Sequence, residues 1–117
     1  MSRGTIAAIN LNALRHNFLV IKKKLPNNPV LAMVKANAYG HGSVAIARSL
    51  DQADAFGVTS LQEAIVLREA GIQQEIVVVT GFVNASDLPL LNQYRLTTFV
   101  HCLEQIEILE QNSNIKP

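Results

Sequence analysis

The chain has 117 residues, of which 49% are hydrophobic and 16% are charged, and its formal net charge is +1. This length allows one domain at most, with enough apolar material for a core, and the near-neutral charge offers no basic surface to nucleic acid. The first residues lack the apolar core of a signal peptide and no apolar run reaches membrane-spanning length, so we expect a cytoplasmic protein without membrane contact.

Cysteine and histidine residues predict no metal site. Cys102 is the only cysteine, so an internal disulfide bond cannot form, and we expect a small buried thiol. His16, His41 and His101 are far apart in the sequence and lack the spacing of metal ligands. We therefore expect these histidines to be surface or turn residues.

The first predicted elements are a short strand and a helix. The strand covers residues 5–9. Leu14, Phe18 and Ile21 then recur at helical spacing in a segment that ends at Pro26, and Asn12 is the expected N-cap.

The next strand ends at a lysine. Residues 30–34 form a continuous apolar run that stops at Lys35, as expected for a parallel strand buried on both faces. An amine at this position is partly desolvated, which penalises its charged form and makes the neutral amine available to attack a carbonyl. Lys35 is therefore a candidate Schiff-base lysine, although a lysine at a strand end more often simply extends into water.

A glycine-spaced turn follows the lysine strand. Gly40 and Gly42 flank His41, and Ser43 is the predicted N-cap of the next helix. Two glycines before a helix N-terminus let the backbone come close to a ligand, and they suit an anion without specifying one.

Three further strand–helix units continue the pattern. Their strands are predicted at residues 55–58, 76–79 and 96–100. The helix after the first of these strands begins with a capping box, Ser60 to Glu63, and ends at Gly71. A weaker helix is predicted from about Ser86, and the last one covers residues 103–109.

Alternating strands and helices at this spacing predict an α/β fold with a parallel sheet. Every strand then has its carboxyl end at the same edge, where parallel α/β folds carry their chemistry. Two architectures fit the pattern: a small open doubly wound sheet, or the first half of a TIM-type (β/α)8 barrel. The pattern alone favours the open sheet, because a closed barrel takes about 250 residues.

A resemblance to a known family changes this preference. Nine consecutive residues, Val34-Lys35-Ala36-Asn37-Ala38-Tyr39-Gly40-His41-Gly42, resemble the cofactor-lysine signature of the alanine racemases, fold type III enzymes that use pyridoxal phosphate. The resemblance implies that Lys35 is catalytic and holds pyridoxal 5'-phosphate as an aldimine, and that the hydroxyl of Tyr39 binds the cofactor phosphate. The remaining residues of the string shape the turn.

The resemblance extends over nearly the whole chain, more loosely outside this string. It implies that residues 1–117 are the N-terminal part of a pyridoxal-phosphate-binding (β/α)8 barrel, which in the family precedes a β-rich domain. The short strand at residues 5–9 is then expected to pair with that later domain, which these residues do not include.

The family's mechanism uses two bases. The resemblance implies that Lys35 is one base in the interconversion of L-alanine and D-alanine, which supplies D-alanine for peptidoglycan. The second base is a tyrosine of the partner subunit in a homodimer. That tyrosine and two cofactor-contacting arginines lie beyond Pro117 in the family's order. We therefore expect an N-terminal fragment that is inactive alone.

Other functions remain open on the sequence. A noncatalytic pyridoxal-phosphate carrier has the same fold type, but its lysine motif lacks the Ala-Tyr-Gly-His-Gly continuation. Racemases for serine or for several amino acids share the lysine signature. An unrelated α/β binding domain predicts an acidic cluster or a glycine-rich dinucleotide turn, and neither occurs here.

Overall fold

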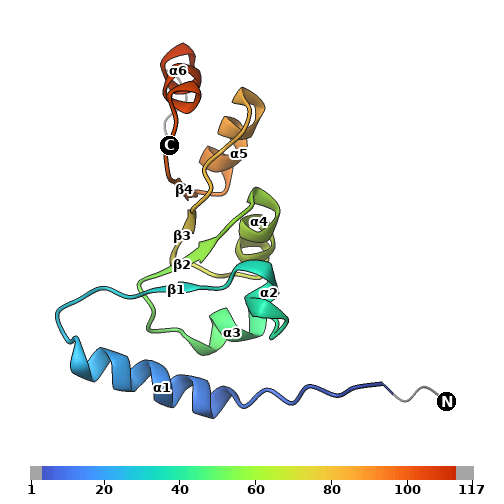
Figure 1. The fold of residues 1–117 in the computed structure, drawn as a ribbon, viewed down its shortest axis with the longest axis vertical. Helices are drawn as coiled ribbons and strands as arrows, with labels where there is room; N and C mark the ends of the chain where they lie inside the picture. The colour runs from blue at the N-terminus through green and yellow to red at the C-terminus, as the bar shows by residue number, and fades with distance from the viewer. Residues whose placement is uncertain (1–3, 113–117) are drawn as a thin grey trace.

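The computed structural model describes residues 4–112 as strands and helices that alternate along the chain (Figure 1). The elements are α1 (Leu11–Lys24), β1 (Leu31–Met33), α2 (Lys35–Tyr39), α3 (Ser43–Ser49), β2 (Ala55–Val58), α4 (Leu61–Glu69), β3 (Glu75–Val78), the 3-10 helix η1 (Ala85–Asp87), α5 (Leu88–Gln93), β4 (Thr97–Thr98) and α6 (Leu103–Gln111). From residue 30 onward the predicted order of strands is confirmed: β2 has the predicted bounds, β3 lies one residue earlier than predicted, and β1 and β4 are shorter than predicted. Within residues 4–112, no helix combines the length and apolar character needed to cross a membrane.

The four strands form one parallel sheet with the order β1-β2-β3-β4. Each new strand is added beside the previous one, on the same side. A doubly wound sheet instead reverses its strand order at a switch point, which is where its ligand binds. The sheet order therefore excludes the doubly wound alternative and is the order of consecutive barrel strands.

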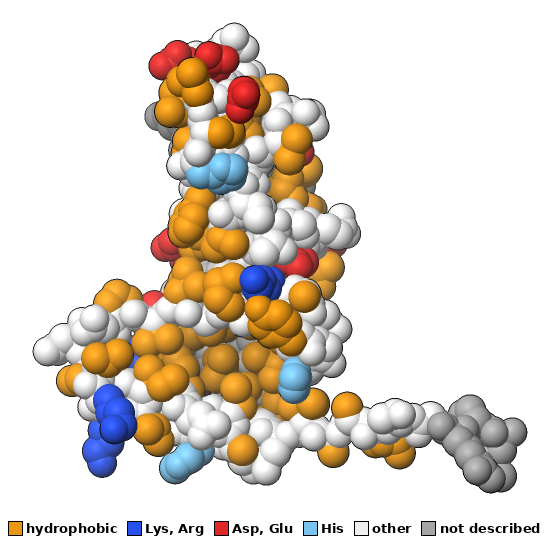
Figure 2. Space-filling view, viewed as in Figure 1, with side chains coloured by type: hydrophobic (Ala, Val, Ile, Leu, Met, Phe, Trp, Pro, Cys, Tyr) orange, Lys and Arg blue, Asp and Glu red, His pale blue; other side chains and the backbone are white. Residues whose placement is uncertain are grey.

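The two faces of the sheet are buried to different extents. Phe56 and Ile76, which are register partners on neighbouring strands, are fully buried under the helices. On the opposite face Leu31 and Met33 are 40% and 41% exposed, and both lie over Gly57, where an added Cβ would meet Leu31 Cδ2 at 2.8 Å. Hydrophobic side chains are accordingly visible on the surface in Figure 2. The core lies between sheet and helices, and on the other face the β1 side chains Leu31 and Met33 are exposed.

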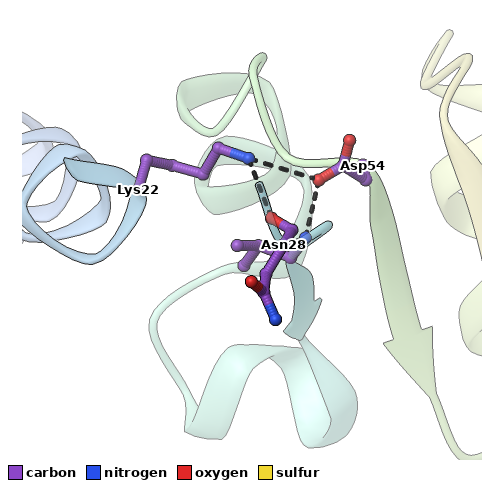
Figure 3. Close-up of polar contacts among 4 residues, drawn as sticks. Lys22, Asn28 and Asp54 are labelled. Carbon is purple, nitrogen blue, oxygen red and sulfur yellow. Dashed lines mark hydrogen bonds and ion pairs between the residues drawn. The ribbon is translucent and has the colours of Figure 1, made fainter. Parts of the chain in front are cut away.

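The amino ends of β1 and β2 are joined by Asp54 (Figure 3). Its Oδ2 accepts a hydrogen bond from the Val30 amide at 2.6 Å and lies 3.7 Å from Lys22 Nζ, which also donates to the Asn28 carbonyl at 3.2 Å. An ion pair this exposed contributes at most about 1 kcal/mol. Its main effect is to set where α1 leads into β1.

Two helix ends test the predicted capping residues. Gly71 follows α4 with φ +93°, and the amides of Gly71 and Ile72 bond back to the carbonyls of Arg68 and Leu67, which is a Schellman motif. This prediction is confirmed. The predicted cap at Asn12 is wrong, because Asn10 caps α1 through its Oδ1, which accepts from the Ala13 amide at 3.0 Å.

Arg68 joins three segments at the amino side of β3 and β4. Its guanidinium donates hydrogen bonds to the carbonyls of Ile72, Gln74 and Tyr94 at 2.7–2.8 Å and to that of Arg95 at 2.9 Å. Partial burial, and to a lesser extent the neighbouring charge of Arg95, lower the pKa of Arg68. These bonds hold the loops that lead into both strands.

The predicted strand at residues 5–9 is not formed. Residues 4–10 have no regular secondary structure, are exposed, and run away from the body of the molecule as an arm (Figure 1). Ile6 is 90% exposed. A strand needs the backbone hydrogen bonds of a neighbour, and no other strand of the described residues lies beside this arm.

Candidate functional site

The candidate site begins at the carboxyl end of β1. The Val34 amide still bonds to the Gly57 carbonyl of β2 at 2.9 Å, so the strand direction is held up to Lys35. Val34 is 1% exposed and Lys35 is half-buried. Lys35 therefore emerges from the core at the edge of the sheet where the sequence places it.

A left-handed turn follows Lys35 directly. Ala36, Asn37, Ala38 and Tyr39 have φ values of +51° to +55°, and the first three have ψ values of +41° to +44°. Residues with a Cβ avoid this region, at a cost of about 1–2 kcal/mol each. The sequence predicts unusual backbone conformations only at Gly40 and Gly42, which have φ values of +86° and +88°. The handedness of the four residues before them was not predicted.

Hydrogen bonds within the segment compensate for this conformation. The Ala38 amide bonds to the Val34 carbonyl at 3.0 Å, and the Gly42 amide bonds to the Asn37 carbonyl at 2.9 Å. The Asn37 side chain accepts from the Ser43 amide at 2.8 Å. The predicted N-cap at Ser43 is thus wrong: Gly42 occupies the cap position of α3, and the side-chain oxygen comes from Asn37.

The turn brings Lys35 and Tyr39 together. Lys35 Nζ lies 5.8 Å from the centroid of the Tyr39 ring, within the range of a cation–π contact. Tyr39 is 67% exposed. Among residues 4–112 the ion pair present joins Lys22 and Asp54, so the Lys35 amine is not held by a carboxylate. An amine and a phenol are therefore available side by side at the sheet edge.

Glu63 connects this turn to the next strand. Its Oε1 accepts from the Ala36 amide at 3.0 Å, and its Oε2 accepts from the Thr59 amide at 2.9 Å, directly after β2. Burial raises the pKa of the Glu63 carboxyl, but hydrogen bonds from the backbone amides of Thr59 and Ala36 outweigh burial and lower that pKa below 4.5. The carboxylate thus stays charged in the site.

Sequence reasoning found only half of this role. The Ser60 hydroxyl accepts from the Glu63 amide at 3.1 Å, so this half of the predicted capping box is confirmed. The other half is not formed, because the Glu63 carboxylate accepts from the Thr59 and Ala36 amides and not from the Ser60 amide. The contact with Ala36 spans 27 positions in the sequence. The sequence predicted that the carboxyl ends of neighbouring parallel strands lie at the same edge of the sheet. Glu63 stands in the first turn of the helix that follows β2, so this predicted edge was the one signal that could have placed it near the lysine.

The remaining strand ends carry polar residues without reactive arrangements. The Thr80 hydroxyl bonds to the Thr59 carbonyl, and His101 Nε2 contacts the Thr80 carbonyl at 2.7 Å. His101 is exposed, as predicted, and so are His16 and His41. Cys102 is a free, partly buried thiol at the N-cap position of α6.

Comparison with known proteins places these observations in a family. The model of the family described as alanine racemase, N-terminal domain, matches residues 9–116. The chain belongs to this family. It is 49% identical over 111 residues to an alanine racemase of Pectobacterium atrosepticum, and 48% identical over 109 residues to one of Aeromonas hydrophila. These alignments cover 95% and 93% of the chain.

Solved structures agree with the family assignment. The alanine racemase of Acinetobacter baumannii has a TM-score of 0.86 at 33% identity over 92% of the chain, and the biosynthetic alanine racemase of Pseudomonas aeruginosa has 0.81 at 37% identity over 86%. The four parallel βα units are the beginning of a (β/α)8 barrel. The chain spans about 30% of the length of these relatives, with shares of 31% and 30% for the two sequences and 32% and 28% for the two structures.

Proposed function

We propose that the chain is the lysine-bearing N-terminal part of an alanine racemase, in which Lys35 binds pyridoxal 5'-phosphate covalently. One observation carries the proposal: the half-buried Lys35 amine stands at the carboxyl end of β1, without a carboxylate partner among residues 4–112, 5.8 Å from the Tyr39 ring. A carbonyl cofactor needs such an amine, and its phosphate needs a donor within reach. These two side chains fit those requirements.

Lys35 has two tasks in this proposal. Its Nζ would hold the cofactor covalently, and the same amine would accept or donate a proton at the substrate Cα. Bound pyridoxal phosphate supplies the ring system that stabilises charge at that carbon. The exposed Tyr39 hydroxyl would donate a hydrogen bond to the cofactor phosphate. The barrel face of β1, with Leu31 and Met33, helps to exclude water once the barrel is closed.

The activity of the whole protein is proposed from the family. We infer interconversion of L-alanine and D-alanine in a cytoplasmic homodimer, with the D-alanine used for peptidoglycan. A tyrosine of the partner subunit is the second base. The predicted strand at residues 5–9, which lies within the exposed arm, would pair with the later β-rich domain. The relatives reported above are named alanine racemases, which supports alanine over serine and favours a racemase over a noncatalytic carrier.

The test is cofactor attachment to the chain. Pyridoxal phosphate is added, the visible absorption band is followed, and borohydride reduction fixes the label for peptide mass spectrometry. We expect the label at Lys35 and loss of the band in Lys35→Ala. Lys23→Ala is the control, because Lys23 is exposed on α1 away from the site. A band of equal strength in Lys35→Ala, or equal labelling across residues 22–24, contradicts the assignment.

Tyr39→Phe tests the phosphate contact separately. A hydrogen bond to a charged group contributes about 1.5–3 kcal/mol, so we expect the dissociation constant of the cofactor to rise about tenfold or more. The band itself should persist. The same affinity for pyridoxal phosphate in Tyr39→Phe and in the unaltered chain contradicts the role of the hydroxyl. Pyridoxal, which lacks the phosphate, should bind Tyr39→Phe and the unaltered chain with equal affinity.

A further inference from the structure

The Glu63 carboxylate links the left-handed turn after Lys35, residues 36–39, to the end of β2 through hydrogen bonds. Its oxygens accept from the Ala36 amide at 3.0 Å and the Thr59 amide at 2.9 Å, and the Thr59 hydroxyl lies 3.2–3.3 Å from both oxygens. Thr59 follows β2, and Ala36 follows the lysine. One side chain therefore fixes the carboxyl ends of two adjacent strands relative to each other.

The bond to Ala36 is made where the backbone changes hand. Ala36 is the first of four consecutive residues with positive φ, and its amide is the first after Lys35. The later residues of the turn are held by bonds inside the segment, such as Gly42 to Asn37. The Ala36 amide is held from outside, by a different element. Without Glu63, the start of the turn loses its anchor to α4.

Only a carboxylate satisfies both donors. Each of its oxygens faces a backbone N–H, and such charge-assisted bonds are about twice as strong as neutral ones. Glutamine offers one acceptor oxygen and places an NH2 group against the other N–H. Aspartate keeps the charge in the first turn of α4, but it is one methylene shorter and does not reach both amides.

We propose that Glu63 is a positioning residue for Lys35, which sets the direction of the lysine by holding the Ala36 amide at the end of β2. Its role in catalysis rests on the function proposed above. Its effect on the turn does not, because the hydrogen bonds exist whether or not a cofactor binds. The two levels can be measured separately.

The first measurement follows the turn itself. Amide hydrogen exchange is compared for the unaltered chain, Glu63→Gln and Glu63→Asp. Glu69→Gln is the matched control, because Glu69 is an exposed acid on the same helix. Loss of about 1.4 kcal/mol of local stability gives a roughly tenfold faster exchange, which we expect at Ala36 and Ala38 in both Glu63 variants. Exchange in β3 and α5 should stay within about twofold of the unaltered chain.

The second measurement follows the lysine through its cofactor. In Glu63→Gln we expect roughly tenfold slower attachment of pyridoxal phosphate at Lys35, because a displaced nucleophile loses much of its orientation. The ratio of circular dichroism to absorbance in the bound cofactor band should also fall, since that ratio reports how the ring is oriented. Glu69→Gln should match the unaltered chain in both readouts.

Each outcome decides between the two proposals. If exchange in the turn is faster in the Glu63 variants but Lys35 is not labelled in the variants or in the unaltered chain, Glu63 positions the turn and the proposed function is wrong. Labelling of Lys35 with unchanged rates, dichroism and turn exchange in both Glu63 variants overturns the positioning role and keeps the proposed function. Faster exchange throughout the sheet in both Glu63 variants also overturns it, because Glu63 then only stabilises the fold.

Discussion

Replacing Arg68 by methionine removes one guanidinium that serves four carbonyls and keeps the apolar part of the side chain. Three of these hydrogen bonds, to Ile72, Gln74 and Tyr94, are partly buried, and the fourth, to Arg95, is exposed. Buried bonds to charged groups contribute about 1.5–3 kcal/mol, and access of water reduces this to about 1 kcal/mol for each partly buried one. The exposed bond adds little. We therefore expect Arg68→Met to lower the free energy of unfolding by about 3 kcal/mol.

Urea denaturation followed by far-ultraviolet circular dichroism measures this loss. With a slope of about 1.5 kcal/mol per molar urea, the midpoint should fall by about 2 M. Arg48→Met is the control, because Arg48 donates one exposed bond, to the Ala70 carbonyl at 2.9 Å. Its midpoint should fall by less than about 0.4 M. If the midpoint of Arg68→Met falls as little as that of the control, the four hydrogen bonds of the Arg68 guanidinium do not stabilise these loops as proposed.

Two further predictions concern α6 and acid stability. Gly81→Ala should destabilise the chain by about 2 kcal/mol in the same urea assay, because Gly81 has φ +78° and an added Cβ would lie 2.6 Å from the Phe99 carbonyl and against Gln105 Nε2. Gly71→Ala is the control, because nothing lies within 4 Å of its added Cβ. Equal urea midpoints for the two variants would contradict a steric contribution at Gly81. The folded-state pKa of Glu63 is lowered below 4.5, so its contribution to the stability of the turn is complete above pH 4.5 and is lost as the pH falls through that lower pKa. The difference between the unaltered chain and Glu63→Gln in local stability of the turn, measured by hydrogen exchange of the Ala36 amide, should therefore shrink below pH 4.5, and a constant difference down to pH about 3 argues against ionised Glu63 as the acceptor.

The succession of strands and helices along the chain from residue 30 onward and the place of the lysine were predictable because both depend on local patterns. Apolar runs bounded by turn residues locate the strands, and Gly71 marks the end of α4 because only glycine takes φ +93° without steric cost. The string around Lys35 was recognisable as a signature. The choice between open sheet and barrel was not decided by these patterns, since it depends on which strands are neighbours.

The details that sequence reasoning missed depend on contacts between distant segments. Asn10 and Asn12 are equivalent by composition, and the structure decides that Asn10 caps α1. Ser43 precedes an apolar helix like any N-cap, but the Asn37 side chain takes its place. Nothing local predicts that Glu63 reaches Ala36. The arm at residues 4–10 has the pattern of a strand without a neighbour to complete it.

The left-handed turn also changes what the lysine signature encodes. Four consecutive residues that carry a Cβ occupy a region that disfavours bulky and β-branched side chains. Alanine at positions 36 and 38 is small enough for that backbone, and asparagine at 37 both tolerates it and caps the next helix. Most residues of the string are thus explained by the left-handed backbone, and Lys35 and Tyr39 are the two with a proposed role toward the cofactor. A sequence that keeps the lysine but places valine or isoleucine at 36 or 38 has lost the path of the backbone, and with it the direction of the amine.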